Sequence, residues 1–482
     1  MEVATHQWLK SLEVAFVSGF PHPLVNRVLD GLRRYFVKLG HRVVDRPGSG
    51  TDVVLTSAPY GKPLDWREAV LFNLRRRFRL DHLPLVFTLV PVTLTAFRES
   101  LIRLERALRR ERPREEDFAF EGLSPTAYQV LLEQGRRGGP LLALERVVQA
   151  QSKSIRVLLV AGEGEPEEAY VFDLAGAHPR IPAGDDDFFY TDLVLRIATA
   201  ASTREVTGHV VVDAPIPQSL WQSLSTPTAL KRASYELGRR NFFTPMVRIS
   251  DLVHVPVVEA SISEQYSEGC FATWDTELNA LVTTVTGSAR PVSKYELGDD
   301  DLAVVVGVRP DGQGALVRHV EGKRNSPPSS EAVEMVEMDA PLPRVEIAPG
   351  LLVPVARSKL HGHRGVRSFD PRVVEFVPLD RPYYYYPVSC ATDAQARAIK
   401  AAFARSQTLN APDDPRPIAF TVLPCHGVVL VEKWVPGYEP LQVLWEAIDS
   451  GALEIDTLVP QGPLSYRPAA GGRMVLVEGV TD

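Results

Sequence analysis

Alternation of strand and helix patterns in the first 110 residues constrains the fold of this chain more than any other feature. The short apolar run at 13–18 (EVAFVS) is typical of a buried parallel strand. Apolar residues then recur at helical spacing over 24–39 and stop at Gly40, a residue common just after a helix. The alternation continues with strand patterns at 41–45, 52–57 and 83–90 and helix patterns at 65–79 and 94–110. Such alternation predicts a doubly wound, mostly parallel sheet.

The rest of the chain reads as a second α/β region and a β-rich region. Strand patterns at 155–160, 169–173 and 209–215 alternate with helix patterns at 188–201 and 217–239. From 303 onward strand patterns dominate, and Pro310-Asp311-Gly312 marks a hairpin turn. The predicted fold class is α/β, with two doubly wound Rossmann-like units followed by a β-rich, antiparallel C-terminal domain. The expected boundaries are 1–115, 116–295 and 296–482.

Composition excludes several classes of protein. The 482 residues are 45% hydrophobic and 23% charged, as in globular proteins of two or three domains. A net charge of −7 gives no general attraction to nucleic acid. The longest apolar stretch, 83–97, is too short to cross a bilayer, and the first residues lack the pattern of a secretory signal. Three cysteines without CxxC spacing fit a reducing compartment. We therefore expect a cytoplasmic protein that binds neither nucleic acid nor a membrane.

An acidic segment ahead of an apolar run is the most unusual local feature. Its acids are Glu259, Glu264, Glu268, Asp275 and Glu277. The ordinary interpretation is a helix at about 279–286, with Asp275 or Thr276 as its N-cap. The functional interpretation is that two or three carboxylates converge on a divalent cation, because hard cations prefer carboxylate oxygens. The sequence leaves both interpretations open.

Two stretches resemble sugar isomerases of the L-fucose and L-arabinose isomerase superfamily. The opening EVAFVSG and the segment EGCFATWDTELNALVTTVTGSARPV (268–292) are similar to that family's first strand and to its C-E-x-D…G-A-L-T…L-T-G-x-P stretch. The resemblance implies a divalent metal, Mn²⁺ or Mg²⁺, held by Asp275, with Glu259 as second ligand and base. Phe271 and Asn279 depart from the family pattern, which has an acid and a glycine there. The implied activity is a metal-dependent isomerisation by proton transfer through an enediolate.

Histidines and cations of the last third could complete such a site. His426 is the expected third metal ligand, and Glu259 and Glu268 are the carboxylates expected to move the proton. His361 and His363 project to the same side of an extended strand, and the neighbouring cations favour an anionic ligand. The residues expected to bind substrate are His361, His363, Arg364, Lys359, Lys323 and Arg324. The alternative is that these cations form exposed basic turns.

The expected partner is a small polar or sugar-like substrate. The run Tyr383–Tyr386, interpreted as a strand, would expose two rings and suits an interface between copies of the chain. We therefore also expect a homo-oligomer. Two other hypotheses stay open: a non-catalytic ligand-binding or assembly protein, and a nucleotide-sugar transferase, which the β-rich last third disfavours. Gly162-Glu163-Gly164 lacks the third glycine of a dinucleotide-binding loop.

Overall fold

The computed structural model divides the chain into two compact units. Unit 1 comprises Met1–Thr203, Val247–Glu264 and Tyr385–Ser389, and unit 2 comprises Arg204–Met246, Gln265–Tyr384 and Cys390–Asp482. The structure describes residues 5–17, 19–60, 84–108, 155–162, 166–172, 181–182, 184–240, 242–243, 269–286, 296–424, 426–456, 459–460 and 464–477. The mixed α/β class expected from the sequence is confirmed.

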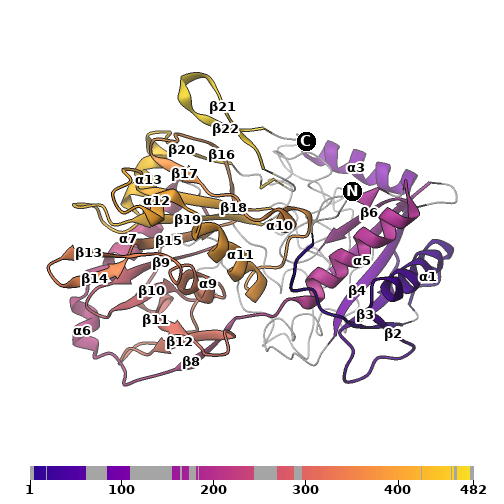
Figure 1. Ribbon diagram of the computed structural model, residues 1–482, viewed down its shortest axis with the longest axis horizontal. Helices are drawn as coiled ribbons and strands as arrows, with labels where there is room; N and C mark the ends of the chain where they lie inside the picture. The colour runs from indigo at the N-terminus through magenta and orange to yellow at the C-terminus, as the bar shows by residue number, and fades with distance from the viewer. Residues whose placement is uncertain are drawn as a thin grey trace. The chain divides into compact units, whose positions relative to one another are not determined.

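Unit 1 is built on a seven-stranded sheet with the strand order β2-β1-β3-β4-β5-β6-β7 (Figure 1). Its strands are β1 (Glu13–Phe16), β2 (Arg42–Val44), β3 (Val53–Ser57), β4 (Leu85–Thr93), β5 (Ile155–Ala161), β6 (Pro166–Phe172) and β7 (Ile181–Pro182). The first five strands in sequence pair in parallel, whereas β6 and β7 are antiparallel. The strands predicted to open a second α/β unit, β5 and β6, extend the first sheet instead.

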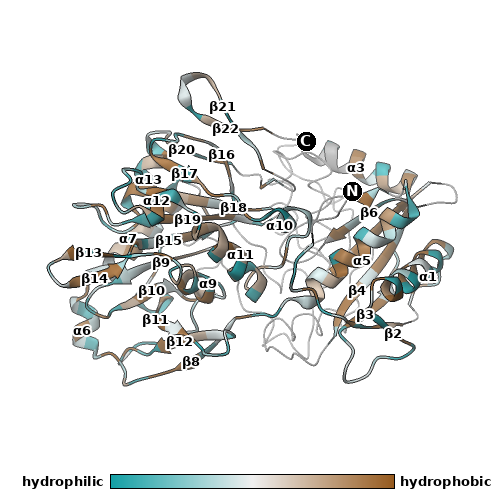
Figure 2. Ribbon diagram, in the orientation of Figure 1, coloured by the Kyte–Doolittle hydropathy of each residue, from teal (hydrophilic) through white to brown (hydrophobic). Residues whose placement is uncertain are grey.

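Helices lie on both faces of this sheet. Helices α1 (Pro23–Lys38) and α5 (Asp186–Ser202) bury Val28, Leu32 and Leu193 against the face that holds Val14 and Leu55. Helix α3 (Leu94–Leu108) packs Phe97 against Tyr170, which points to the opposite face, and the ring centroids are 5.6 Å apart. Brown, apolar strands between mixed helices show this layering (Figure 2). The helix predicted at 65–79 lies outside the described residues.

A short segment from late in the sequence completes unit 1. The Tyr386 hydroxyl donates to Asp192 Oδ1 at 2.8 Å, and Arg196 donates to the Tyr385 carbonyl at 2.9 Å. His6 Nε2 lies 2.8 Å from the Tyr386 carbonyl. Tyr385–Ser389 therefore joins helix α5 to the N-terminal segment of the same unit.

Unit 2 is built on a nine-stranded sheet with the order β17-β18-β19-β15-β9-β10-β11-β12-β8. All its neighbours are antiparallel except the two outermost pairs, β17 with β18 and β12 with β8. The strands are β8 (Gly208–Val211), β9 (Cys270–Asp275), β10 (Ala280–Thr284), β11 (Leu302–Val308), β12 (Gly314–Arg318), β15 (Ala356–Gly362), β17 (Val374–Phe376), β18 (Ile418–Leu423) and β19 (Gly427–Lys433).

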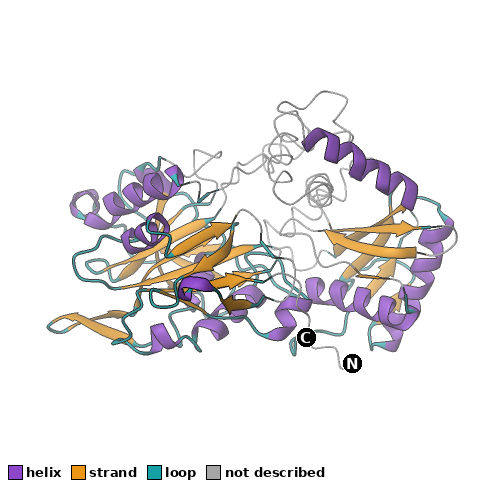
Figure 3. Ribbon diagram, turned by 90° about the horizontal axis from the view of Figure 1, so that it is seen from above, coloured by secondary structure: helices purple, strands orange, loops and turns teal. Residues whose placement is uncertain are grey.

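The two faces of the nine-stranded sheet are covered by different helices (Figure 3). On one face Phe271, Leu360 and Leu430 pack in a core with side chains of α6 (Gln218–Ser223), α7 (Ser225–Arg239) and α13 (Gln442–Asp449). On the other face lie α9 (Ala332–Glu337) and α11 (Asp393–Phe403), which pack on each other. Alternation from Ser358 to Gly362 in β15 thus places Leu360 on one face and Lys359 and His361 on the other.

Smaller elements complete unit 2. A hairpin pairs β13 (Arg344–Ala348) with β14 (Leu351–Pro354), and a four-stranded sheet has the order β20-β16-β22-β21. Its strands are β16 (Gly365–Phe369), β20 (Leu453–Asp456), β21 (Tyr466–Pro468) and β22 (Met474–Leu476). Short helices α10 (Arg381–Tyr385) and α12 (Gln407–Asn410) connect strands. Within the described residues, no helix combines the length and apolar character needed to cross a membrane.

Two local predictions were wrong. The helix expected at 279–286 is strand β10, which pairs with β9 through a tight turn in which Asn279 has φ 46°. The tyrosine run is not a strand: Tyr383 and Tyr384 lie in helix α10, and these two rings and that of Tyr386 are buried. The exposed tyrosine surface that supported an oligomer interface is therefore absent from this part of the described chain.

Candidate metal centre

Three histidines lie together at the ends of two neighbouring interior strands of the nine-stranded sheet. His361 lies in β15 and His363 follows the last residue of that strand, whereas His426 directly precedes β19. Strands β15 and β19 are antiparallel, with His361 opposite Val429 and Gly362 opposite Val428. The end of one strand and the start of the other therefore lie side by side, and this pairing brings His426 to the His361-Gly362-His363 segment.

The three rings form a nearly equilateral triangle. Their centroids are 5.1 Å apart for His361 and His363, and 4.8 Å apart for each of the pairs with His426. The planes are inclined by 62°, 65° and 64°, an approximately three-fold arrangement. The nitrogens that could bind an ion all lie within 4.8 Å of one another. A tetrahedral zinc ion with Zn–N bonds near 2.0–2.1 Å needs nitrogens about 3.4 Å apart, so small ring movements suffice.

Glycines permit this convergence of strands. A Cβ on Gly427 would overlap the carbonyl oxygen of Gly362, and a Cβ on Gly269 would overlap the carbonyl oxygen of His361. Gly269 also has φ 67°, a conformation that side chains disfavour. The backbones on both sides of His361 approach more closely than any other residue type allows.

Burial and hydrogen bonding orient the cluster. His361 is fully buried and His426 is 4% exposed, whereas His363 is partly exposed. His361 Nδ1 lies 3.1 Å from the Val428 carbonyl oxygen, which can accept a proton only from an Nδ1–H group. That tautomer leaves Nε2 as the nitrogen with a lone pair for an ion, the usual arrangement around metal-binding histidines.

Asp275 lies away from this cluster. It is at the end of β9 remote from Cys270, the residue that pairs with His361. Its Oδ1 accepts the backbone N–H groups of Glu277 (3.0 Å) and Leu278 (2.8 Å). The carboxylate therefore caps the turn before β10, close to the ordinary interpretation of this segment. Within the residues that the structure describes, the three histidines are the group of three or more metal-binding side chains found close together, and Asp275 is not part of it.

The proposed carboxylate catalysts fall outside the described chain. Glu259 and Glu268 lie in the stretch that the structure does not describe, so their roles stay predictions.

Lys359 points to the same face of the sheet as His361 but is engaged in the interior. Its Nζ donates to the Met335 carbonyl at 2.6 Å and forms an ion pair with Asp339. Lys359 is fully buried, and burial lowers the pKa of its ammonium. Burial raises the pKa of Asp339, although the nearby Lys359 ammonium acts in the opposite direction and lowers it. The Lys359–Asp339 pair and the bond to Met335 hold α9 against the sheet. The ammonium group of Lys359 is therefore engaged in the interior and is not available to bind a substrate.

The other predicted substrate-binding cations are divided between two places. Arg364 directly follows His363 in the turn to β16 and is therefore adjacent to the histidines in sequence. It is 9% exposed. Lys323 and Arg324 follow β12. Lys323 donates to the Leu302 carbonyl and lies 4.5 Å above the Trp221 ring, and the Arg324 N–H donates to Asp300 Oδ1 at 3.0 Å. Burial lowers the pKa of Lys323 to about 8.

The sequence named all three histidines but divided their roles. His426 was expected as a metal ligand, and His361 and His363 were expected to bind substrate. The available signal was the repeated His-Gly pair, His361-Gly362 and His426-Gly427, at the ends of two apolar strands. What sequence could not supply was the pairing of those strands.

Comparison with known proteins finds no relative. No family model matches the chain, and neither a curated protein nor a solved structure matches it.

Proposed function

We propose that this protein is a metal-dependent enzyme whose ion is held by His361, His363 and His426. The observation that carries the proposal is the three-fold packing of the imidazole rings, with centroids 4.8–5.1 Å apart. Three imidazole rings packed together cannot form ion pairs with one another, and they are too polar to serve as a hydrophobic core. Neither of these structural roles therefore explains the cluster. Their arrangement is that of a facial three-nitrogen ligand set.

The donor atoms select the metal. Imidazole nitrogen suits zinc and neighbouring first-row transition metals, whereas Mg²⁺ and Mn²⁺ favour carboxylate and carbonyl oxygen. We therefore propose zinc in place of the Mn²⁺ or Mg²⁺ implied by the isomerase resemblance. Three protein ligands leave a fourth position for water or substrate, as in catalytic rather than structural zinc sites.

The substrate we propose is a small polar molecule with a carbonyl or hydroxyl group. Bound to such a site, the ion supplies Lewis-acid polarisation of that oxygen, or of a water molecule. The partly exposed His363 provides the open side of the cluster, and His361, held by Val428, fixes the inner side. Isomerisation through an enediolate remains our proposal for the reaction, with Glu268, which belongs to the same unit as the histidines, as the base.

The first test is metal binding by the stripped protein. Zn²⁺, Mn²⁺ and Mg²⁺ are titrated into chelator-treated protein while the Tm and the heat of binding are followed. Zinc at 100 times its Kd should stabilise the protein by about 2.7 kcal/mol. His361→Ala and His426→Ala should lose this effect, whereas His319→Ala and Asp275→Asn should keep it. An equal zinc response in wild type and His426→Ala would disprove the site.

The second test separates a catalytic from a structural ion. The competing function is a non-catalytic protein in which the ion only fastens β15 to β19, and the burial of His361 and His426 favours it. Cobalt(II) replaces zinc in such sites and gives visible absorption bands sensitive to its ligands. Addition of azide should change these bands if a coordination position is open. Unchanged bands with cobalt bound would favour the structural ion.

A further inference from the structure

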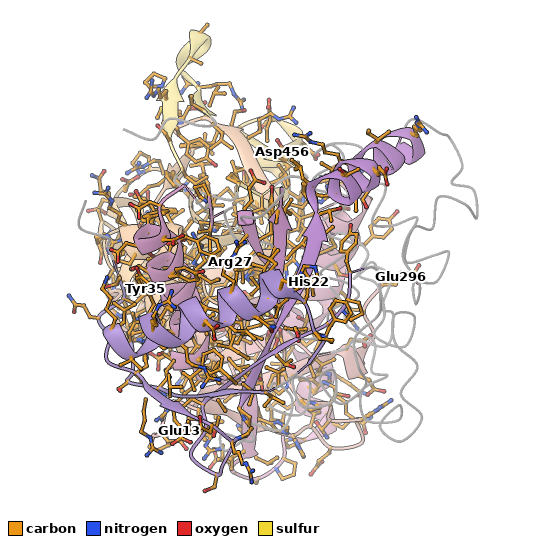
Figure 4. The ribbon with its side chains drawn as sticks, turned by 90° about the vertical axis from the view of Figure 1, so that its right-hand side faces the viewer. Glu13, His22, Arg27, Tyr35, Glu296 and Asp456 are labelled. Atoms are coloured by element: carbon orange, nitrogen blue, oxygen red, sulfur yellow. The ribbon has the colours of Figure 1, made fainter. Side chains whose placement is uncertain are left out.

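Unit 1 contains a cavity of about 440 Å³ that no part of the proposed function uses. It lies where strands β4 and β5 end, beside the first turns of helix α1. Its wall includes His22, Leu24, Arg27, Val92, Thr93 and Ala161. Figure 4 shows His22 and Arg27 near the same end of that helix. Every wall residue belongs to unit 1, so this cavity is independent of the three histidines of unit 2.

The cavity lies at the carboxyl ends of two parallel strands. Strands β2, β1, β3, β4 and β5 are adjacent in this order and all parallel. Open α/β sheets bind ligands in the crevice outside the carboxyl ends of their strands, and this cavity lies on that side of the sheet. Thr93 ends β4, and Ala161 ends β5.

The polar part of the wall is cationic or a hydrogen-bond donor. Among the described residues that line the cavity, none is acidic, and Arg27 contributes a guanidinium group. His22 Nδ1 accepts the Leu24 N–H at 3.2 Å, so Nε2 carries the ring proton. Thr93 Oγ1 accepts the Ala96 N–H at 3.1 Å, which leaves its hydroxyl proton for another acceptor.

The start of helix α1 is not itself the binding group. Pro23 has no N–H, His22 already caps the Leu24 N–H, and the Asn26 N–H donates to the His22 carbonyl. Most N–H groups of this first turn are thus absent or already engaged, and we expect side chains, above all that of Arg27, to provide the recognition of an anion. The bidentate fork of arginine matches the oxygens of phosphate and carboxylate groups.

The remainder of the wall is apolar. Pro23, Leu24, Pro91, Val92 and Ala161 supply hydrocarbon surface. Such a wall suits the flat, weakly polar body of a ligand rather than a second charged group. A bare inorganic anion would leave most of this surface in contact with water.

We propose that this cavity binds an organic anion of mononucleotide size, with its oxyanion held by Arg27 and His22 and its flat body on the apolar wall. The shared chemistry is a phosphate or carboxylate joined to a planar group. A volume of about 440 Å³ falls within the usual range for small-molecule sites.

The test uses four probes on the full-length protein: AMP, adenosine, benzoate and inorganic phosphate. Their binding is followed by calorimetry and by the Tm. AMP or benzoate should bind, and adenosine should bind at least about tenfold more weakly than AMP, since a charged contact is lost. A preference for AMP over benzoate identifies phosphate as the oxyanion, and the reverse identifies carboxylate. Equal affinity for AMP and adenosine, or no response to any probe, overturns the proposal.

Variants on one helix provide the control. Arg27→Met should weaken binding of the preferred probe by about tenfold or more, and Arg27→Lys should restore part of it. Arg34→Met removes an exposed arginine from the same helix and should leave binding unchanged. Wild-type affinity in Arg27→Met contradicts the proposal. Zinc binding by the histidine cluster should be the same in all these variants, so failure of this site and of the metal site can be told apart.

Discussion

Gly427 is the residue on which the geometry of the metal centre depends most directly. A Cβ at this position would overlap the Gly362 carbonyl and come within 2.9 Å of the His363 Cα. Gly427→Ala must push β15 and β19 apart, and we expect it to lower the free energy of unfolding by about 2 kcal/mol. It should weaken zinc binding as well, because His363 and His426 move with the two strands.

The matched control for Gly427→Ala is Gly307→Ala in the same sheet. A Cβ there would lie 3.7 Å from Leu316 Cδ1, an ordinary contact. Its zinc affinity should equal that of wild type. Equal zinc affinity in Gly427→Ala, measured by calorimetry, would show that the close approach of the strands is not needed for the site.

Glu432 makes the stability of unit 2 depend on pH. Its carboxyl group is buried beside helix α13, where Oε1 accepts the Leu441 N–H at 3.1 Å. Burial raises its pKa from 4.5 to about 8. Below pH 4.5 both folded and unfolded chains hold the proton, so the group has no effect. Between these values only the unfolded chain ionises, and stability therefore falls as pH rises to about 8.

Glu432→Gln should abolish this pH dependence, because an amide can accept the same hydrogen bond without ionising. Relative to wild type, the variant should gain about 4 kcal/mol between pH 5 and pH 8.5. Urea unfolding at several pH values measures it. Glu446→Gln, at an exposed position of α13, should run parallel to wild type. A constant difference between Glu432→Gln and wild type at all pH values would refute this explanation.

At the scale of elements, helix α5 begins with an aspartate N-cap. Asp185 accepts the N–H groups of Asp187 (2.9 Å) and Phe188 (3.3 Å). Asp185→Ala should cost about 1 kcal/mol, and Asp185→Asn, which keeps the acceptor, only a few tenths. Hydrogen exchange of the Asp186–Ser202 helix reports the difference. Similar exchange in the alanine and asparagine variants would mean that the cap does not limit opening of α5.

Elements whose pattern reflects local physics were predicted correctly. The apolar run of β1 and the helical spacing and final glycine of α1 identify both elements without tertiary information. Strand β10 was mistaken for a helix because its run Ala280–Thr284 (ALVTT) is buried on both faces and shows no alternation of apolar and charged residues. Such a run has no period to distinguish the two structures. Its β-branched Val282, Thr283 and Thr284 were the evidence for a strand.

The candidate site shows the same limit. Residue types drew attention to His361, His363 and His426, but their meeting depends on the register between β15 and β19, which are separated by more than sixty residues. Asp275 shows the opposite case. Its carboxylate accepts two neighbouring backbone N–H groups, a local role that the residue type alone does not distinguish from that of a metal ligand.

At the scale of the whole molecule, the chain passes between the two units several times. Tyr385–Ser389 belongs to unit 1, although most of the residues of unit 2 precede it in the sequence. The predicted domain boundaries were placed where the strand and helix pattern changes along the chain. Such changes cannot reveal that a five-residue segment within the C-terminal region belongs to the N-terminal unit. The second predicted α/β region is thus divided: β5 to α5 belong to unit 1, and α6 and α7 belong to unit 2.

The returning segment gives unit 1 a contact that can be removed without touching unit 2. Tyr386→Phe deletes the hydroxyl that donates to the buried Asp192, whose other oxygen accepts from Arg196 Nε at 3.0 Å. A buried carboxylate that loses a donor costs about 1–3 kcal/mol. Hydrogen exchange should therefore accelerate in α5 and leave β15 and β19 unchanged, and zinc affinity should equal that of wild type. Tyr438→Phe, at a residue that is 37% exposed, should alter neither the exchange nor the zinc affinity. Faster exchange throughout both units would instead show that the two units open together and that unit 1 has no stability of its own.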